Sequence, residues 1–394
     1  MSDARGAARL RVAWILPAFP RDAADPLVPY WGPMAGALAQ ACDLDVLPLR
    51  FPSGMPSFDC GRARIHPLPQ GNLRLRHSPR LWRAALERLG QLHRERPFRL
   101  IHALHGNEAG FLGALASRML GVPLLVHLGG GETVGFPELG YGAQALTVER
   151  WQVRAALRRA RRITVGSLAQ ARAAARLIPG PSTRRIVLAP IGIDLAPFAA
   201  AVRPEGAALS GPRLISVAEL NAVKDHQTLL RAVAPWAKAL PELRLDLVGG
   251  GPRLASLRYL ARDLGIADQV VWRGQIPNAA LPPILAGAAG FVHAARHEAQ
   301  GLALIEAAAT GLPIASTRVG VAEELRPDTV ATVRPGDPAG LSRAIGRTLA
   351  RAMRSDQAIE AALDATVRRF DLPEAIGAWL DLYDALAPGA GHGR

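Results

Sequence analysis

Short apolar runs alternate with amphipathic stretches along most of the chain. Residues 11–17 (RVAWILP) predict a strand, residues 34–41 a helix and residues 44–49 a second strand. Strand, loop, helix, strand is the opening of a doubly wound parallel sheet. The same half of the chain predicts further strands at residues 100–102, 122–127, 163–166 and 186–189 and further helices at 110–120, 151–162 and 169–177.

A second series of alternating elements follows a change in composition at residues 199–212. Expected strands occupy residues 214–218, 243–248, 270–272, 290–293 and 314–317, and expected helices occupy 227–234, 254–264 and 281–288. A last helix is expected at residues 370–386. The sequence therefore predicts a first domain at 1–198, a linker at 199–212, a second domain at 213–369, and a C-terminal segment, 370–394, that packs back towards the first domain.

Composition is consistent with two ordinary globular domains. The chain has 394 residues, of which 49% are apolar and 20% charged. No apolar run approaches the ~18 residues that a membrane span needs. The two cysteines, Cys42 and Cys60, form neither a disulfide framework nor a metal set, so we expect a cytoplasmic protein.

The net charge of +14 belongs almost wholly to the first half of the chain. Residues 1–200 carry 26 arginines against 13 acidic residues, whereas residues 201–394 carry 21 basic against 20 acidic residues. A one-sided positive field predicts an anionic partner for the first domain. The basic amphipathic stretch 73–99 fits either a helix lying on an anionic membrane surface or a surface helix whose apolar face covers the core.

The segment HEAQGLALIEAAATG, residues 297–311, carries Glu298 and Glu306 on either side of Gly301. Its alanine-rich second half predicts a helix that ends near Gly311. The first amides of such a helix attract anions, so two carboxylates beside them suit a diphosphate that carries sugars. The spacing alone is also typical of two solvated helix-end charges.

Other candidate side chains follow predicted strands, at the sheet edge where α/β proteins bind ligands. Lys224 lies in the loop after the strand at 214–218, and three glycines, 249–251, follow the strand at 243–248. His127 ends a strand before glycines 129–131; His105 is similarly placed and is the weaker candidate. A buried structural role remains the alternative for His127, and a simple turn the alternative for Gly32, which precedes the first helix.

Over residues 11–386, the chain resembles the GT-B glycosyltransferases, specifically the retaining GT4 (glycosyltransferase group 1) family. Glu298 and Glu306 match its E-x7-E motif, and LVGGGP and VHLGGGE resemble its GxGP and HGxE segments. RIVLAPIGIDLAPF and VAELNAVKDHQTLLRA resemble two further family segments. The resemblance implies an α/β GT-B fold, with two Rossmann-like, doubly wound domains facing a central cleft.

The resemblance also implies residue roles. Lys224 would neutralise the donor diphosphate, Glu298 would hold the sugar hydroxyls, and Glu306 would bind the ribose hydroxyls. His127, with Glu298, would contact the transferring sugar at the reaction centre. The implied donor-binding residues are Gly32, Lys224, Gly250, Gly251, Glu298, Ala299, Gly301, Leu302 and Glu306. The donor is a UDP- or GDP-sugar, bound as a substrate, and no cofactor or metal ion is expected.

One departure from the family pattern concerns charge. Many members have an arginine five residues before the lysine, and this chain has Glu219. At ~4 Å and an effective dielectric constant near 20, replacing attraction with repulsion changes the interaction with a diphosphate by roughly 8 kcal/mol before screening. We therefore expect Glu219 to point away from the donor, and Arg21, Arg253 or Arg296 to supply the missing charge.

The function that this resemblance implies is retaining transfer of a sugar to an acceptor, in polysaccharide, glycolipid or other cell-envelope glycan synthesis. The acceptor is expected to be a glycan, a lipid-linked saccharide or another anionic molecule, and the protein to work in the cytoplasm or at the inner membrane face. A non-catalytic GT-B scaffold and a sugar-nucleotide epimerase are the alternatives. Nucleic-acid binding is not expected, because no recognition motif accompanies the positive charge.

Overall fold

The computed structural model describes residues 9–22, 25, 27–69, 78–178, 180–201, 211–325, 329–352 and 365–387. It divides into two compact units. Unit 1 comprises residues 1–166, 170–193 and 372–394, and unit 2 comprises residues 167–169 and 194–371. Most of the expected linker, residues 202–210, lies outside the described residues.

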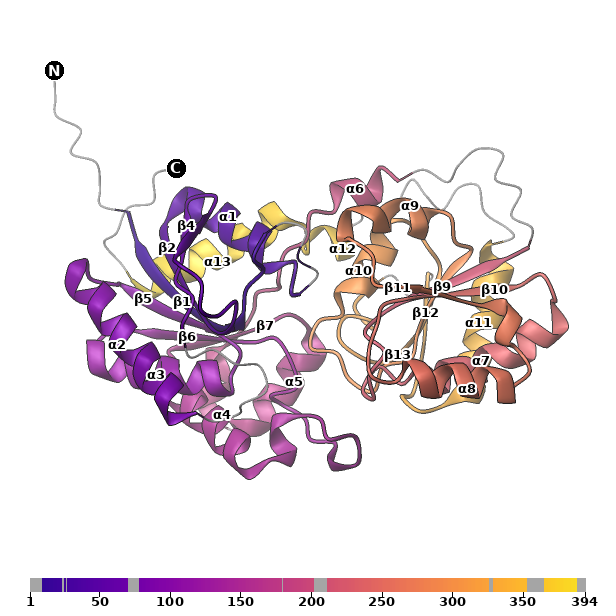
Figure 1. Ribbon diagram of the computed structural model, residues 1–394, viewed down its shortest axis with the longest axis horizontal. Helices are drawn as coiled ribbons and strands as arrows, with labels where there is room; N and C mark the ends of the chain where they lie inside the picture. The colour runs from indigo at the N-terminus through magenta and orange to yellow at the C-terminus, as the bar shows by residue number, and fades with distance from the viewer. Residues whose placement is uncertain are drawn as a thin grey trace, which may run out of the picture. The chain divides into compact units, whose positions relative to one another are not determined.

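Unit 1 is built on an eight-stranded sheet with the order β3-β4-β2-β1-β5-β6-β7-β8 (Figure 1). All neighbours pair in parallel except β3 and β4, which form an antiparallel hairpin at one edge. The strands are β1 Arg11–Ala18, β2 Asp43–Phe51, β3 Phe58–Cys60, β4 Ala63–Ile65, β5 Leu100–Leu104, β6 Leu124–Leu128, β7 Arg162–Val165 and β8 Ile186–Leu188.

Helices cover both faces of this sheet. They are α1 Trp31–Ala41, α2 Pro79–Glu95, α3 Glu108–Leu120, α4 Thr147–Arg159, α5 Leu168–Leu177 and α13 Leu372–Leu386, with short 3-10 turns η1 Pro137–Leu139, η2 Ala143–Ala145 and η3 Gly180–Arg185. Because side chains alternate along a strand, β1 serves two cores. Ala13 and Ile15 pack into a cluster with residues of α2, α3 and α4, whereas Trp14 contacts the rings of Trp31 in α1 and Trp379 in α13.

The last helix completes the second of these cores. The Trp14 indole N–H donates to the hydroxyl of Tyr383 at 2.8 Å, and the Trp379 indole N–H donates to the Pro190 carbonyl at 3.0 Å. Both α13 side chains are at most 1% exposed. Burying indole and phenol rings with their polar atoms satisfied stabilises the packing strongly, so α13 is an integral part of unit 1.

Unit 2 contains a six-stranded, all-parallel sheet with the order β11-β10-β9-β12-β13-β14. Its strands are β9 Arg213–Val217, β10 Arg244–Val248, β11 Val270–Gly274, β12 Gly290–His293, β13 Ile314–Thr317 and β14 Val330–Val333. Its helices are α6 Ala196–Ala199, α7 His226–Ala239, α8 Leu254–Asp263, α9 Leu281–Ala286, α10 Leu302–Ala309, α11 Pro338–Ala352 and α12 Ala365–Arg368, with η4 Ala267–Gln269 and η5 Asn278–Ala280. Two parallel sheets flanked by helices confirm the predicted α/β class.

Several elements differ from the sequence-based expectation. The β3–β4 hairpin, β14 and α11 were not predicted. Helix α1 begins at Trp31, before the expected residue 34. Helix α2 begins at Pro79, capped by the Ser78 hydroxyl, and its Leu81, Ala85 and Leu89 side chains belong to the core. The apolar face of α2 is therefore occupied, which corrects the suggestion that this helix lies on a membrane. Within the described part of the chain, no helix combines the length and apolarity needed to cross a bilayer.

Candidate functional site

The two-glutamate segment connects β12 to α10 in unit 2. Gly301 precedes the helix with φ 91°, a left-handed conformation that glycine adopts without strain, and α10 starts at Leu302. Glu298 therefore lies in the loop and Glu306 in the second turn of the helix. The first amides of a helix have no intrahelical acceptor, so the backbone at Leu302 provides N–H groups suited to an anion.

Lys224, Glu298 and His293 form one ionic cluster. Lys224 Nζ donates to Glu298 Oε1 at 2.5 Å, and His293 Nε2 lies 3.0 Å from the same oxygen. Burial on its own would raise the pKa of Glu298, but the charge of Lys224 and the hydrogen bond with His293 outweigh it and hold that pKa well below its usual range. Glu298 is therefore a carboxylate throughout the physiological range, able to accept hydrogen bonds from hydroxyl groups.

The backbone around Glu298 is fixed by the neighbouring connections of unit 2. The Arg296 amide donates to the Val223 carbonyl at 2.7 Å, which joins the Glu298 loop to the Lys224 loop. The Thr317 hydroxyl donates to the Ala295 carbonyl at 2.7 Å, and the Val321 amide to the Gln300 carbonyl at 2.8 Å. Three loops at one edge of the sheet are thus held in register, which fixes the position of the carboxylate.

Glu306 differs from Glu298 in its electrostatics. Its side chain is 8% exposed, and burial raises its pKa to about 7. Near neutral pH this carboxyl therefore exists in both protonation states. It is poised to donate or accept a hydrogen bond with a ligand hydroxyl.

The glycine loop after β10 contributes through its backbone. A Cβ on Gly249 (φ 132°) would lie 2.1 Å from the Ala218 carbonyl oxygen, and one on Gly251 (φ 157°) would lie 2.6 Å from that of Leu220. Gly250 has more room, because its added Cβ would meet only the Gln275 side chain at 3.4 Å. Gly249 and Gly251 allow this loop to pack against the connection that leads to Lys224.

Glu219 is exposed, and its Oε2 accepts a hydrogen bond from the side-chain amide Nδ2 of Asn221 at 2.8 Å. Among the arginines considered as replacements, Arg253 lies at the start of α8 and Arg296 lies 3.7 Å from Asp225. Arg21 belongs to unit 1 and pairs with Asp25 at 2.8 Å. Arg253 and Arg296 are the two that share a unit with Lys224 and Glu298.

In unit 1, the structure corrects the position expected for Gly32 and shows that His127, near the end of β6, is buried. Gly32 is the second residue of α1 and does not precede the helix. His127, in β6, is 1% exposed: its Nδ1 lies 3.1 Å from the Thr164 hydroxyl and its ring packs against Trp31 and Trp379. Burial lowers the pKa of His127 to about 3, helped by His105, so the ring is neutral. These contacts give His127 a packing role in addition to its expected role in the reaction.

His105, the weaker candidate, has the more polar surroundings. It directly follows β5 with φ 119°, which a non-glycine residue adopts only under strain. Its Nδ1 lies 2.9 Å from Glu132 Oε1, and the same carboxylate accepts hydrogen bonds from the Gly106 and Gly130 amides. Burial would raise the pKa of Glu132, but His105 and hydrogen bonds from the backbone amides of Glu132 and Gly106 lower it to about 2. Glu132 thus fixes the orientation of the His105 ring.

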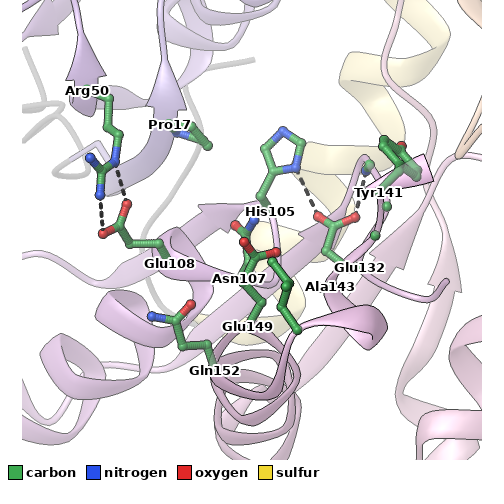
Figure 2. A pocket seen from close by; sticks show the side chains of 15 residues that line it. Pro17, Arg50, His105, Asn107, Glu108, Glu132, Tyr141, Ala143, Glu149 and Gln152 are labelled. Carbon is green, nitrogen blue, oxygen red and sulfur yellow. Dashed lines mark hydrogen bonds and ion pairs between the residues drawn. The ribbon is translucent and has the colours of Figure 1, made fainter. Parts of the chain in front are cut away.

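His105 lines a cavity of about 460 Å³ within unit 1 (Figure 2). The residues around it lie at the ends of β1 and β2, follow β5 and β6, or belong to α3, α4 and the turns before α4: Pro17, Arg50, His105, Asn107, Glu108, Gly130, Gly131, Glu132, Gly140, Tyr141, Gly142, Ala143, Leu146, Glu149 and Gln152. We refer to this cavity as the unit 1 pocket. Its lining comes from five separate parts of the sequence without a common spacing. The sequence offers one signal for this pocket, namely that His105, Asn107 and Glu132 follow predicted strands.

No group of three or more His, Cys, Asp or Glu side chains in the described ranges is arranged to hold a metal ion. The acidic pair at the start of β2 is used in ion pairs: Asp43 lies 2.9 Å from Arg96, and Asp45 lies 2.8 Å from both Arg11 and His66.

Two family models match the chain, one in each half. A model described as "Glycosyl transferase 4-like domain" matches residues 27–192, and one described as "Glycosyl transferases group 1" matches residues 211–351. Two parallel-sheet units, with a lysine, glutamates and glycines at the strand ends of the second, define a glycosyltransferase of the GT-B class. The chain belongs to the glycosyltransferase group 1 (GT4) family, as its motifs predicted.

Solved structures share the fold. Sucrose-phosphate synthase from Thermosynechococcus elongatus superposes with a TM-score of 0.76 at 22% identity, covering 96% of this chain and 99% of that one. Anabaena HepE in complex with UDP and glucose gives a TM-score of 0.73 at 16% identity, covering 96% and 100%. These identities support the fold alone.

Curated relatives act on different acceptors. The 2-deoxystreptamine N-acetyl-D-glucosaminyltransferase of Streptomyces fradiae is 28% identical over 284 residues, which is 68% of this chain and 66% of that protein. The D-inositol 3-phosphate glycosyltransferase of Acidothermus cellulolyticus is 31% identical over 225 residues, 53% of this chain and 50% of that protein. The matched region thus spans about half to two thirds of these relatives.

Proposed function

We propose that this glycosyltransferase moves a sugar, with retention of anomeric configuration, from a UDP- or GDP-sugar to a hydroxyl of an acceptor that unit 1 binds. The observation that supports it best is the cluster of Lys224, Glu298 and His293 beside the N-terminus of α10. An ammonium group, helix amides and an ionised carboxylate together suit a pyrophosphate joined to a hydroxylated ring.

In the proposed reaction, the bond between the anomeric carbon and the phosphate oxygen breaks as the acceptor oxygen bonds to that carbon. The acceptor proton passes to the departing phosphate. Lys224 and the first amides of α10 stabilise the charge that develops on the leaving diphosphate. Glu298 accepts hydrogen bonds from the transferring sugar and Glu306 from the ribose, while Gly250 and Gly251 bring backbone close to the donor.

On the acceptor side, we assign His105 and His127 different tasks. His105 lines the unit 1 pocket and is oriented by Glu132, so its Nε2 can accept a hydrogen bond from an acceptor hydroxyl. His127 contacts the transferring sugar, with its ring held by Thr164 and two tryptophans. Gly32 brings the first turn of α1 towards the donor.

The named acceptors of the relatives, 2-deoxystreptamine and D-inositol 3-phosphate, are both cyclitols. We therefore propose a sugar or cyclitol ring as acceptor, free or as part of an envelope glycan or glycolipid. The test incubates the full-length protein with UDP- and GDP-sugars and such acceptors and detects products by mass spectrometry. Product that disappears in E298Q and K224Q but persists in K238Q, a change at the exposed second lysine, supports the proposal.

Two alternatives give distinct results in the same experiment. Nucleotide binding without transfer to any acceptor would indicate a scaffold protein. Conversion of the donor sugar without an acceptor would indicate an epimerase.

We also propose that the protein works in the cytoplasm, with peripheral contact to the inner membrane face through α4 instead of α2. Val148 and Trp151 are 47% and 54% exposed, and Arg154 and Arg158 share that side of the helix. Apolar and basic side chains on one face suit an anionic bilayer. The protein should bind anionic vesicles at low salt and dissociate at high salt, and W151S/R154Q should bind less. Equal binding to neutral vesicles would contradict this.

A further inference from the structure

The unit 1 pocket has a charge opposite to that of the surrounding half of the chain. Residues 1–200 carry a surplus of 13 positive charges. The pocket lining, however, contains one arginine, Arg50, against Glu108, Glu132 and Glu149, a formal charge of −2 when histidines are left out of the count. The net charge of unit 1 is therefore a poor guide to what this pocket binds.

Arg50 is already occupied by a carboxylate. Its Nε and Nη2 each donate to Glu108 at 2.7 Å, in a two-pronged pair that is largely buried. The Trp82 indole N–H also donates to Glu108 at 2.7 Å and fixes the carboxylate in place. A phosphate bound to Arg50 would have to displace this pair, and the remaining carboxylates would repel it. Figure 2 shows the pair at one side of the pocket.

The other polar atoms of the pocket are mainly hydrogen-bond acceptors. Asn107 occupies the N-cap position of α3, where an asparagine side chain ordinarily caps the helix, yet it makes no capping hydrogen bond. Its Oδ1 is buried without a hydrogen-bond partner in the structure. A buried acceptor in this state costs free energy unless a ligand donates to it. Asn107 and Glu149 both line the pocket (Figure 2).

The volume and position of the unit 1 pocket suit a small polyhydroxylated ligand. A volume of about 460 Å³ accommodates one or two sugar-sized rings. The pocket lies beyond the carboxyl ends of β1, β2, β5 and β6, the edge at which open α/β sheets bind ligands. Hydrogen-bond acceptors in the lining suit ligand hydroxyl groups, and its acidic side chains suit an ammonium group.

We propose that the unit 1 pocket binds the acceptor, and that it selects a polyhydroxylated ring bearing an amino group over the same kind of ring bearing a phosphate. This inference rests on the proposed function, which it narrows by naming the acceptor class. It replaces the expectation of an anionic acceptor, which rested on net charge. Asn107 accepts from a ring hydroxyl or the amino group, and Glu149 pairs with the ammonium.

The experiment measures binding by titration calorimetry on the full-length protein without nucleotide. The probes are 2-deoxystreptamine, which carries two amino groups, myo-inositol, which is neutral, and D-inositol 3-phosphate. We expect the affinities to fall in that order. E149Q should weaken 2-deoxystreptamine binding about tenfold or more and leave myo-inositol nearly unchanged, because it removes a charge and keeps the shape. E138Q, at an exposed position of η1 outside the pocket, should alter neither.

Equal binding of the neutral and amino compounds, tighter binding of the phosphate, or no binding at millimolar concentration would overturn the inference. UDP and GDP are titrated into the same samples. The protein could instead bind nucleotide and transfer sugar to some other acceptor, without binding the three ring compounds in the expected order. That outcome would reject the acceptor class and leave the proposed function intact. Absence of both nucleotide binding and transfer would reject the proposed function itself.

Discussion

Lys224 and Glu298, which belong to different connections of unit 2, share a hydrogen bond of 2.5 Å. The ammonium group proposed to bind the diphosphate is thus already neutralised before any donor is present. An arriving diphosphate competes with Glu298 for Lys224, while the sugar hydroxyls engage the carboxylate. Binding of the phosphates and of the sugar is therefore coupled through this pair.

Replacing Lys224 should weaken donor binding and remove the positive charge that lowers the pKa of Glu298. K224Q removes a charged hydrogen bond, worth about 1.5–3 kcal/mol, so the affinity for UDP or GDP should fall about 10- to 100-fold. Calorimetric titration of the nucleotide measures this, with K238Q as the matched change of an exposed lysine. Unchanged nucleotide affinity in K224Q would remove the lysine from the donor site.

Glu306 should make the protein less stable as pH rises. Its pKa is raised from 4.5 to about 7, so between these values the unfolded chain releases a proton that the folded protein retains. Stability contributed by protonated Glu306 is therefore fully present below pH 4.5 and lost by pH 7 to 8. At 1.36 kcal/mol per pKa unit, the loss approaches about 3 kcal/mol.

The corresponding variant is E306Q, which cannot ionise. Its melting temperature relative to the wild type should rise steadily from pH 5 to pH 8, as followed by differential scanning calorimetry. A difference that is independent of pH would show that Glu306 has an ordinary pKa. Nucleotide affinity should fall in E306Q at pH 8, since an amide accepts hydrogen bonds from ribose less well than a carboxylate.

The three glycines after β10 should respond differently to alanine. G249A and G251A place a Cβ against backbone carbonyl oxygens at positive φ, so both should lower stability by more than about 1 kcal/mol and weaken nucleotide binding. G250A meets only a flexible glutamine side chain and should be close to the wild type in stability. Thermal denaturation of the three variants gives the comparison. Equal effects at all three positions would contradict the loop packing.

Substitution of His105 should affect mainly activity, whereas substitution of His127 should affect mainly stability. H127A opens a cavity among Thr164, Trp31 and Trp379, and should cost roughly 2–5 kcal/mol of unfolding free energy. H105N should cost less stability than H127A and lower the transfer rate about 10- to 100-fold, with a raised KM for the acceptor. Urea denaturation and steady-state kinetics test both. Loss of stability in H105N with normal kinetics would assign this residue a structural role.

The sequence singled out the residues of the proposed donor site more readily than those of the unit 1 pocket, for a physical reason. Glu298, Gly301 and Glu306 lie on one continuous loop and helix, so their spacing alone places them at a helix N-terminus. The pocket instead combines Arg50, Asn107 and Glu149 from distant segments. Only the folded sheet brings them together, and no local pattern marks them.

Amphipathic helices show the same limit. The pattern of apolar and basic residues in α2 fits both a membrane surface and a protein core. The structure shows that its apolar side chains pack into the core. Conversely, α11 carries Leu341, Ile345 and Leu349 at helical spacing and could have been predicted from that pattern. Net charge averages over unit 1, whereas a ligand meets the few charges that line one pocket, so the anionic acceptor predicted from net charge and the acceptor proposed from the unit 1 pocket differ.

The contacts of Trp14 with Tyr383 and Trp379 also set the order of events on the ribosome. Every residue of unit 2 is synthesised before α13, which unit 1 requires to close its second core. All residues of unit 2 are therefore available for folding before those of unit 1 are complete. Until α13 has been synthesised, unit 1 keeps an unfilled apolar surface around Trp14 that chaperones can recognise.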